Sequence, residues 1–149
     1  MVALRLGRDI SAQLAATQGA LVLGRQKMDD TTVALLAAAL SANASVTRVD
    51  LRDNQIGDAG AVSLAAHLTN NAAVTEIDLT GNAAIGAAGA EALVALATSN
   101  ANIVGVEFDA NGEMGDDAQQ RVAALCQGWG FRVSGFGFGF GYLLIVCGG

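Results

Sequence analysis

The sequence predicts an α/β fold in which strand, turn and helix units stack side by side. One residue pattern recurs along the chain every 28 to 29 residues. Each copy holds a short stretch in which apolar and polar residues alternate, as in a strand, followed by apolar residues at helical spacing. With 149 residues, of which 52% are hydrophobic and 15% charged, the chain is long enough to bury a core and too apolar to be disordered.

The repeat is clearest in the middle of the chain. Four residues of one copy recur 28 positions later, in the pairs Val46 and Val74, Val49 and Ile77, Leu51 and Leu79, and Asn54 and Asn82. The frame runs forward through Ile103, Val106, Phe108 and Asn111, and back through Leu21, Leu23, Gln26 and Met28. A single copy cannot bury its two apolar edges, so the copies must stack on one another.

An asparagine follows the strand of each copy. Its side-chain amide can satisfy the backbone groups of the bend, so Asn54, Asn82 and Asn111 predict a ladder along the stack. Gln26 is the imperfect member of this ladder in the first copy.

The pattern L-x-x-L-x-L-x-x-N-x-I-x-D/A-x-G-x-x-x-L resembles the leucine-rich repeat over residues 18–127. The repeat length is similar to that of the ribonuclease-inhibitor subclass, which is also found in the tropomodulin C-terminal domain and in NOD-like receptors. The resemblance implies a leucine-rich repeat solenoid, a short right-handed horseshoe arc with about five parallel strands inside and helices outside. It does not imply one function, because proteins of this architecture bind unrelated partners.

We expect a single domain, residues 1–149, with different segments at its two ends. Residues 1–17 are interpreted as a cap or half-repeat with a short helix from Ile10 to Thr17, and an organelle-targeting helix is the alternative. The repeats are expected at residues 18–44, 45–72, 73–101 and 102–130, followed by an apolar, Gly/Phe-rich segment at 131–149.

The C-terminal segment continues the repeat frame. Val133, Phe136, Phe138 and Gly141 match the strand of the preceding copy, which predicts a fifth strand. This segment caps the core, docks on another protein or subunit, or lies on a membrane surface, and its exposed edge would be Phe136, Phe138, Phe140 and Tyr142. It is too short and too rich in glycine for a transmembrane helix.

Composition and charge narrow the function classes. Eight basic and fourteen acidic residues give a net charge of -6, which argues against binding of nucleic acid. Cys126 and Cys147 are too few for a disulfide framework or a zinc site, so we expect a reducing, intracellular compartment and most simply the cytoplasm.

No residues suggest catalysis. The only histidine, His67, occupies a helical position at the outer edge of its copy, and Cys126 occupies an inward helical position. Trp129 follows the last helix and is expected to pack under the tail. We therefore expect no enzymatic activity, no cofactor and no metal site.

The outward strand positions form three columns across the repeats. The first column is Ala20, Arg48, Glu76 and Gly105; the second is Val22, Asp50, Asp78 and Glu107; the third is Gly24, Arg52, Thr80 and Asp109. We expect Leu51, Leu79 and Phe108 to be buried, while the acidic second column faces solvent or a partner. Arg48, Asp50, Arg52, Glu76, Asp78, Thr80, Glu107 and Asp109 are the candidate protein-binding residues of this concave face. Its acidic column predicts a partner with a basic surface, and a merely solvated face is the alternative.

The sequence favours a non-enzymatic scaffold or adaptor for protein interactions, a structural subunit of a larger assembly. An actin-regulating module like the tropomodulin C-terminal domain is one alternative. A ligand-binding protein or enzyme is the other.

Overall fold

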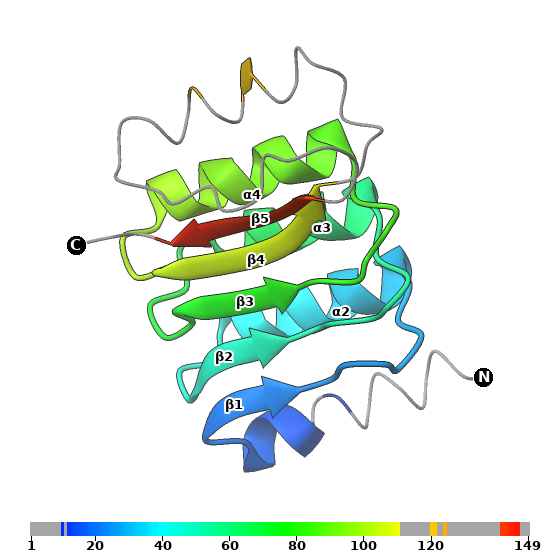
Figure 1. The fold of residues 1–149 in the computed structure, drawn as a ribbon. Coiled ribbons are helices and arrows are strands. Elements are labelled where there is room, and N and C mark those ends of the chain that lie inside the picture. Colours follow the sequence, from blue (N-terminus) through cyan, green and yellow to red (C-terminus); the bar gives the residue numbers. More distant parts are fainter. Residues whose placement is uncertain (1–9, 11, 111–119, 122–123, 125–140, 147–149) are drawn as a thin grey trace.

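The computed structural model describes residues 10, 12–110, 120–121, 124 and 141–146. Strands and helices alternate along it: β1 (Gly19–Val22), α2 (Asp30–Ser41), β2 (Val46–Asp50), α3 (Asp58–Leu68), β3 (Glu76–Leu79), α4 (Ala87–Ser99) and β4 (Gly105–Ala110), followed by β5 (Gly141–Val146). The strands form one sheet in the order β1-β2-β3-β4-β5. The three labelled helices lie together on one face of this sheet (Figure 1).

The predicted α/β solenoid is confirmed, and its period sets the sheet register. β1 to β4 run parallel, and Leu21, Val49, Ile77 and Val106 face one another from strand to strand. All four side chains are buried, as are Leu51, Leu79 and Phe108. The repeat places one apolar residue of each copy at the same depth in the core, which gives a continuous core from one coil to the next.

The helices present one apolar stripe each to the sheet. Leu36 of α2, Leu64 of α3 and Leu93 of α4 occupy equivalent positions and are fully buried. Before β1, residue 10 and residues 12–16 are helical, and Ile10 and Leu14 join the core. The predicted short helix at this end is thus confirmed, while its role as a cap stays a prediction.

The fifth strand differs from the expectation of parallel strands throughout. β5 pairs antiparallel to β4, with Gly141 opposite Ala110 and Val146 opposite Gly105. It forms over Tyr-Leu-Leu-Ile-Val, residue types of high β-propensity. A parallel strand needs a crossover connection, whereas a strand that only closes an edge can pair in either direction. The predicted strand residues Val133, Phe136 and Phe138 lie outside the described residues.

Candidate functional site

The sheet face opposite the helices carries the predicted columns, and we call it the open face. Ala20, Arg48, Glu76 and Gly105 are register partners across β1 to β4. Val22, Asp50, Asp78 and Glu107 form the next row, as the repeat period predicted. The structure therefore brings together the candidate residues of the first two columns.

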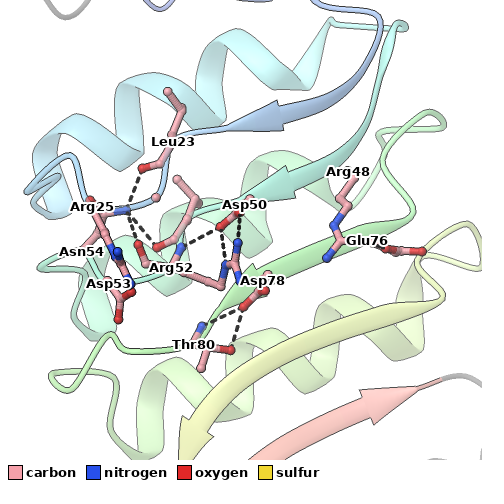
Figure 2. Close-up of polar contacts among 12 residues, drawn as sticks. Leu23, Arg25, Arg48, Asp50, Arg52, Asp53, Asn54, Glu76, Asp78 and Thr80 are labelled. Atoms are coloured by element: carbon pink, nitrogen blue, oxygen red, sulfur yellow. Dashed lines mark hydrogen bonds and ion pairs between the residues drawn. The ribbon is translucent and has the colours of Figure 1, made fainter.

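The side chain of Asp50 is hydrogen-bonded to Arg52, two residues further along the chain. Its Oδ1 accepts hydrogen bonds from the backbone N of Arg52 at 3.1 Å and from Arg52 Nε at 3.0 Å. Its Oδ2 accepts from Arg52 Nη2 at 2.7 Å (Figure 2). The side-chain hydrogen bond to Arg52 lowers the pKa of Asp50, although burial opposes the shift.

Asp78 repeats this arrangement one strand further along. Its Oδ1 accepts from the backbone N of Thr80 at 3.1 Å and from Thr80 Oγ1 at 2.7 Å. Arg52 Nε also lies 3.4 Å from Asp78 Oδ2, so one guanidinium links carboxylates of the neighbouring strands β2 and β3 (Figure 2). Each carboxylate thus caps the end of its strand by satisfying the amide two residues on.

These contacts correct the expectation that Asp50 and Asp78 face solvent or a partner. Each side chain is only 8% exposed, because it folds down onto the strand end beneath Arg52. A carboxylate held in this way has few free lone pairs and little exposed surface for a partner. Of the three acidic residues in this row, only Glu107 is exposed as expected.

Two further ion pairs lie on or beside the open face. Arg48 Nη1 lies 3.4 Å from Glu76 Oε2, and both side chains are about half exposed (Figure 2). At the end of the first coils, Arg25 Nε lies 3.1 Å from Asp53 Oδ2. Because Arg48 and Arg52 offset two of the three negative charges of Glu76, Asp50 and Asp78, this part of the face carries little net charge.

An open hollow borders the face where β1 and β2 end. It has a volume of about 310 Å³ and is lined by Val22, Gly24, Arg25, Asp50, Arg52 and Asp53. The backbone of Arg25 and of Asp53 has positive φ angles of 61° and 53°, and Gly81 occupies the same position of the next copy with φ 80°. A Cβ on Gly81 would clash with the side chain of Asp53, which would then have to move.

The predicted asparagine ladder holds the bends beside this face. Asn54 Nδ2 donates to the carbonyls of Leu23 and Leu51, while its Oδ1 accepts from the backbone N of Gln26 and of Met28. One coil further on, Asn82 Nδ2 donates to the carbonyls of Leu51 and Leu79, and its Oδ1 accepts from the backbone N of Ile56. Asn111 lies outside the described residues.

A second ladder runs along the opposite bends, and the sequence analysis missed it. Asn71 Nδ2 donates to the carbonyls of Leu40 and Asn43, and Asn100 Nδ2 donates to those of Leu68 and Asn71. The signal was available, since Asn43, Asn71 and Asn100 recur with the repeat period. Together the two ladders fix both edges of the coils, so the open face has a rigid frame.

Other candidate residues stand as follows. Thr80 is half-buried on Asp78, and the side chain of Asp109 lies outside what the structure describes, as do Phe136, Phe138, Phe140, Cys126, Trp129 and Cys147. Only the backbone of Tyr142 is placed, opposite Asp109. His67 is exposed on α3, as expected, with Nδ1 2.8 Å from the Ser63 carbonyl.

The described part of the chain holds neither a metal-binding cluster nor a membrane-spanning helix. Among these residues, no three His, Cys, Asp or Glu side chains gather in a way that could hold a metal ion. No helix among them has the length and apolar character needed to cross a membrane.

Stacked strand and helix coils with an asparagine ladder define a β/α solenoid, and comparisons with known proteins agree. The sequence model described as Leucine Rich repeat matches residues 42–65 and 70–94. Residues 42–65 and 70–94 are therefore leucine-rich repeats. No curated protein sequence matches this chain.

Solved structures show the same fold. Thirty-four of their chains match this one. One of them, the Actin-Binding Site 2 (ABS2) of leiomodin-1, superposes with a TM-score of 0.70 and 17% sequence identity over 83% of this chain and 71% of that chain. At this identity, the likeness concerns the fold.

Proposed function

We propose that this chain is a non-enzymatic module that binds another protein through its open face. One observation carries the proposal: the described helices cover only one face of the sheet, and the strands present exposed side chains on the other. A sheet face backed by a rigid core presents side chains at fixed spacing, which is what recognition of a folded surface or peptide requires.

The internal ion pairs argue against acid-base catalysis by these residues. Arg48 with Glu76 and Arg52 with Asp50 and Asp78 hold one another at 2.7 to 3.4 Å on an open surface. Catalytic acids and bases need enclosure or unpaired charge to shift their pKa values toward neutrality, whereas the pKa of Asp50 is lowered. Service as an intracellular scaffold or adaptor within a larger assembly belongs to the same proposal.

Photo-crosslinking from defined positions tests the proposal. A photoreactive phenylalanine analogue replaces Arg48, which is exposed on the open face, or Ala66, which is exposed on α3 and serves as the control. Irradiation in extracts of the source cells should join partner protein to the chain labelled at position 48, and excess unlabelled chain should compete. Equal products from both positions, or products from position 66 alone, would contradict binding through the open face.

A second candidate function, regulation of actin, is favoured by the fold shared with the Actin-Binding Site 2 of leiomodin-1. It predicts that the purified chain co-sediments with actin filaments or changes the rate of actin polymerisation. Binding lost on Arg48→Glu but kept on His67→Glu would place actin on the open face. An unchanged polymerisation time course with no co-sedimentation rules this candidate out.

A further inference from the structure

In the row Val22, Asp50, Asp78 and Glu107, the two middle side chains are bonded within the chain and the two outer ones are exposed. Leu144 of β5 is the register partner of Glu107 on the far side. The carboxylate of Asp50 already accepts hydrogen bonds from Arg52, and that of Asp78 accepts them from Thr80. Glu107 is exposed, and within the described residues no cation pairs with it. At the opposite end Val22 is 68% exposed, the most exposed of the large hydrophobic residues described.

The neighbouring row offers less to a partner. Arg48 and Glu76 already pair with each other, and Ala20 and Gly105 at its ends have little or no side chain. In the hollow beside Val22, both guanidinium groups, of Arg25 and Arg52, are also paired. Among the described side chains of these two rows, one apolar side chain and one carboxylate are therefore left for a partner.

Their separation is set by the sheet. Val22 on β1 and Glu107 on β4 are three strand steps apart in direct register. With a spacing of about 4.8 Å between strands, the two positions lie about 14 Å apart. This distance corresponds to about four residues of an extended segment or about ten residues of a helix.

We propose that this row binds a protein segment carrying an apolar side chain over Val22 and a lysine or arginine over Glu107, about 14 Å apart. The inference rests on the proposed function and makes it specific. Charge complementarity supports the choice of partner, because the chain has a net charge of -6 and Glu107 is an uncompensated carboxylate of the face. The proposal keeps the basic partner that the sequence predicts. It assigns the contact to the carboxylate of Glu107 alone instead of to Asp50, Asp78 and Glu107 together.

Selection from a displayed library of random linear peptides tests this on the full chain. Enriched peptides should carry a cation and an apolar residue at the stated spacing. Glu107→Gln should weaken their binding about three- to tenfold and reduce its salt dependence, and Val22→Ser should weaken it by a similar factor. Glu91→Gln and Leu35→Ser, matched changes on the helix side, should leave affinity unchanged.

Charge reversal at position 107 distinguishes a local contact with Glu107 from nonspecific attraction by the net negative charge of the chain. A library selected on Glu107→Lys should yield an acidic residue in place of the cation while the apolar residue is retained. The inference is wrong if no peptide is enriched over a blank surface, or if affinity is indifferent to both Glu107→Gln and Val22→Ser. In either case cross-linking from position 48 would still support the proposed function, whereas cross-linking from position 66 alone would refute both.

Discussion

At the scale of single residues, Asn82 illustrates how a polar side chain can belong in the core of a repeat. It is fully buried, yet its amide donates to the carbonyls of Leu51 and Leu79 and accepts from the backbone N of Ile56. Each bond satisfies a backbone group that water cannot reach. The ladder thus removes the desolvation cost that a buried bend would otherwise carry.

Replacing this amide should be costly. Asn82→Ala leaves two carbonyls and one N–H of the bend without that partner, so the free energy of unfolding should fall by about 2 to 4 kcal/mol in a urea titration. Asn70→Ala is the control, because Asn70 is exposed and should change stability by less than about 0.5 kcal/mol. Equal losses for the two variants would contradict the structural role of the ladder.

The carboxylate of Asp50 adds a pH dependence of known sign. The hydrogen bond from Arg52 lowers its pKa in the folded chain, so folding favours the ionised form. The stabilisation is complete above the unfolded-state pKa of about 3.9 and is lost as pH falls through the lower folded value. The difference in unfolding free energy between the wild type and Asp50→Asn should therefore be largest near neutral pH and should narrow below about pH 4. A difference that is constant from neutral pH down to about pH 2 would show that the charge is not responsible.

At the scale of the elements, α3 and α4 are each capped by the helix before them. Gly57 and Gly86, the N-cap residues of α3 and α4, have no side chain to cap with. Asp30 of α2 accepts from the backbone N of Gly57 and Gly60, and Asp58 of α3 accepts from those of Gly86 and Gly89. A carboxylate at a helix N-terminus satisfies free N–H groups and complements the helix dipole. Capping between coils therefore couples neighbouring repeats.

Gly89→Ala tests this coupling. Alanine normally stabilises a helix by about 1 kcal/mol over glycine. Here the new Cβ would lie 2.7 Å from Asp58 Oδ1 and 2.9 Å from Ile85 Cγ2, and the carboxylate could move away only by giving up its two hydrogen bonds. We expect a net loss of about 1 to 3 kcal/mol in the free energy of unfolding.

A double-mutant cycle supplies the control for that experiment. In the Asp58→Ala background the capping bonds are already absent, so Gly89→Ala should cost less than in the wild type. The neighbouring exposed substitution Ala88→Gly should cost about 1 kcal/mol, the usual propensity difference. An increase in stability on Gly89→Ala alone would contradict the close packing of α3 against α4.

At the scale of the whole molecule, the sheet is open and its edges differ. β1 forms one edge, and β5 pairs with β4 along all six residues from Gly105 to Ala110 at the other. An exposed strand edge offers unpaired N–H and C=O groups to other chains. By pairing with β4, the C-terminal strand β5 satisfies these backbone groups on the edge of β4.

Removing the C-terminal segment should therefore cause self-association. Deletion of residues 131–149 uncovers the edge of β4, and the truncated chain should aggregate or form higher oligomers in sedimentation experiments. A truncated chain that stays monomeric with the melting temperature of the full chain would show that β5 is dispensable. Whether Phe136, Phe138, Phe140 and Tyr142 also dock on a partner remains a prediction.

The repeat period alone determined the strand register, the inward and outward faces of β1 to β4, and one asparagine ladder. Each of these depends on local spacing repeated along the chain, so the columns at Arg48 and at Asp50 could be written down from the sequence. Tertiary structure decided the burial of Asp50 and Asp78, because that burial depends on Arg52 reaching carboxylates of two strands. It also decided the direction of β5, since an edge strand after the last repeat is not bound by the period. Spacing fixes where a side chain begins, whereas its charge partner and final exposure depend on which other side chains reach it in three dimensions.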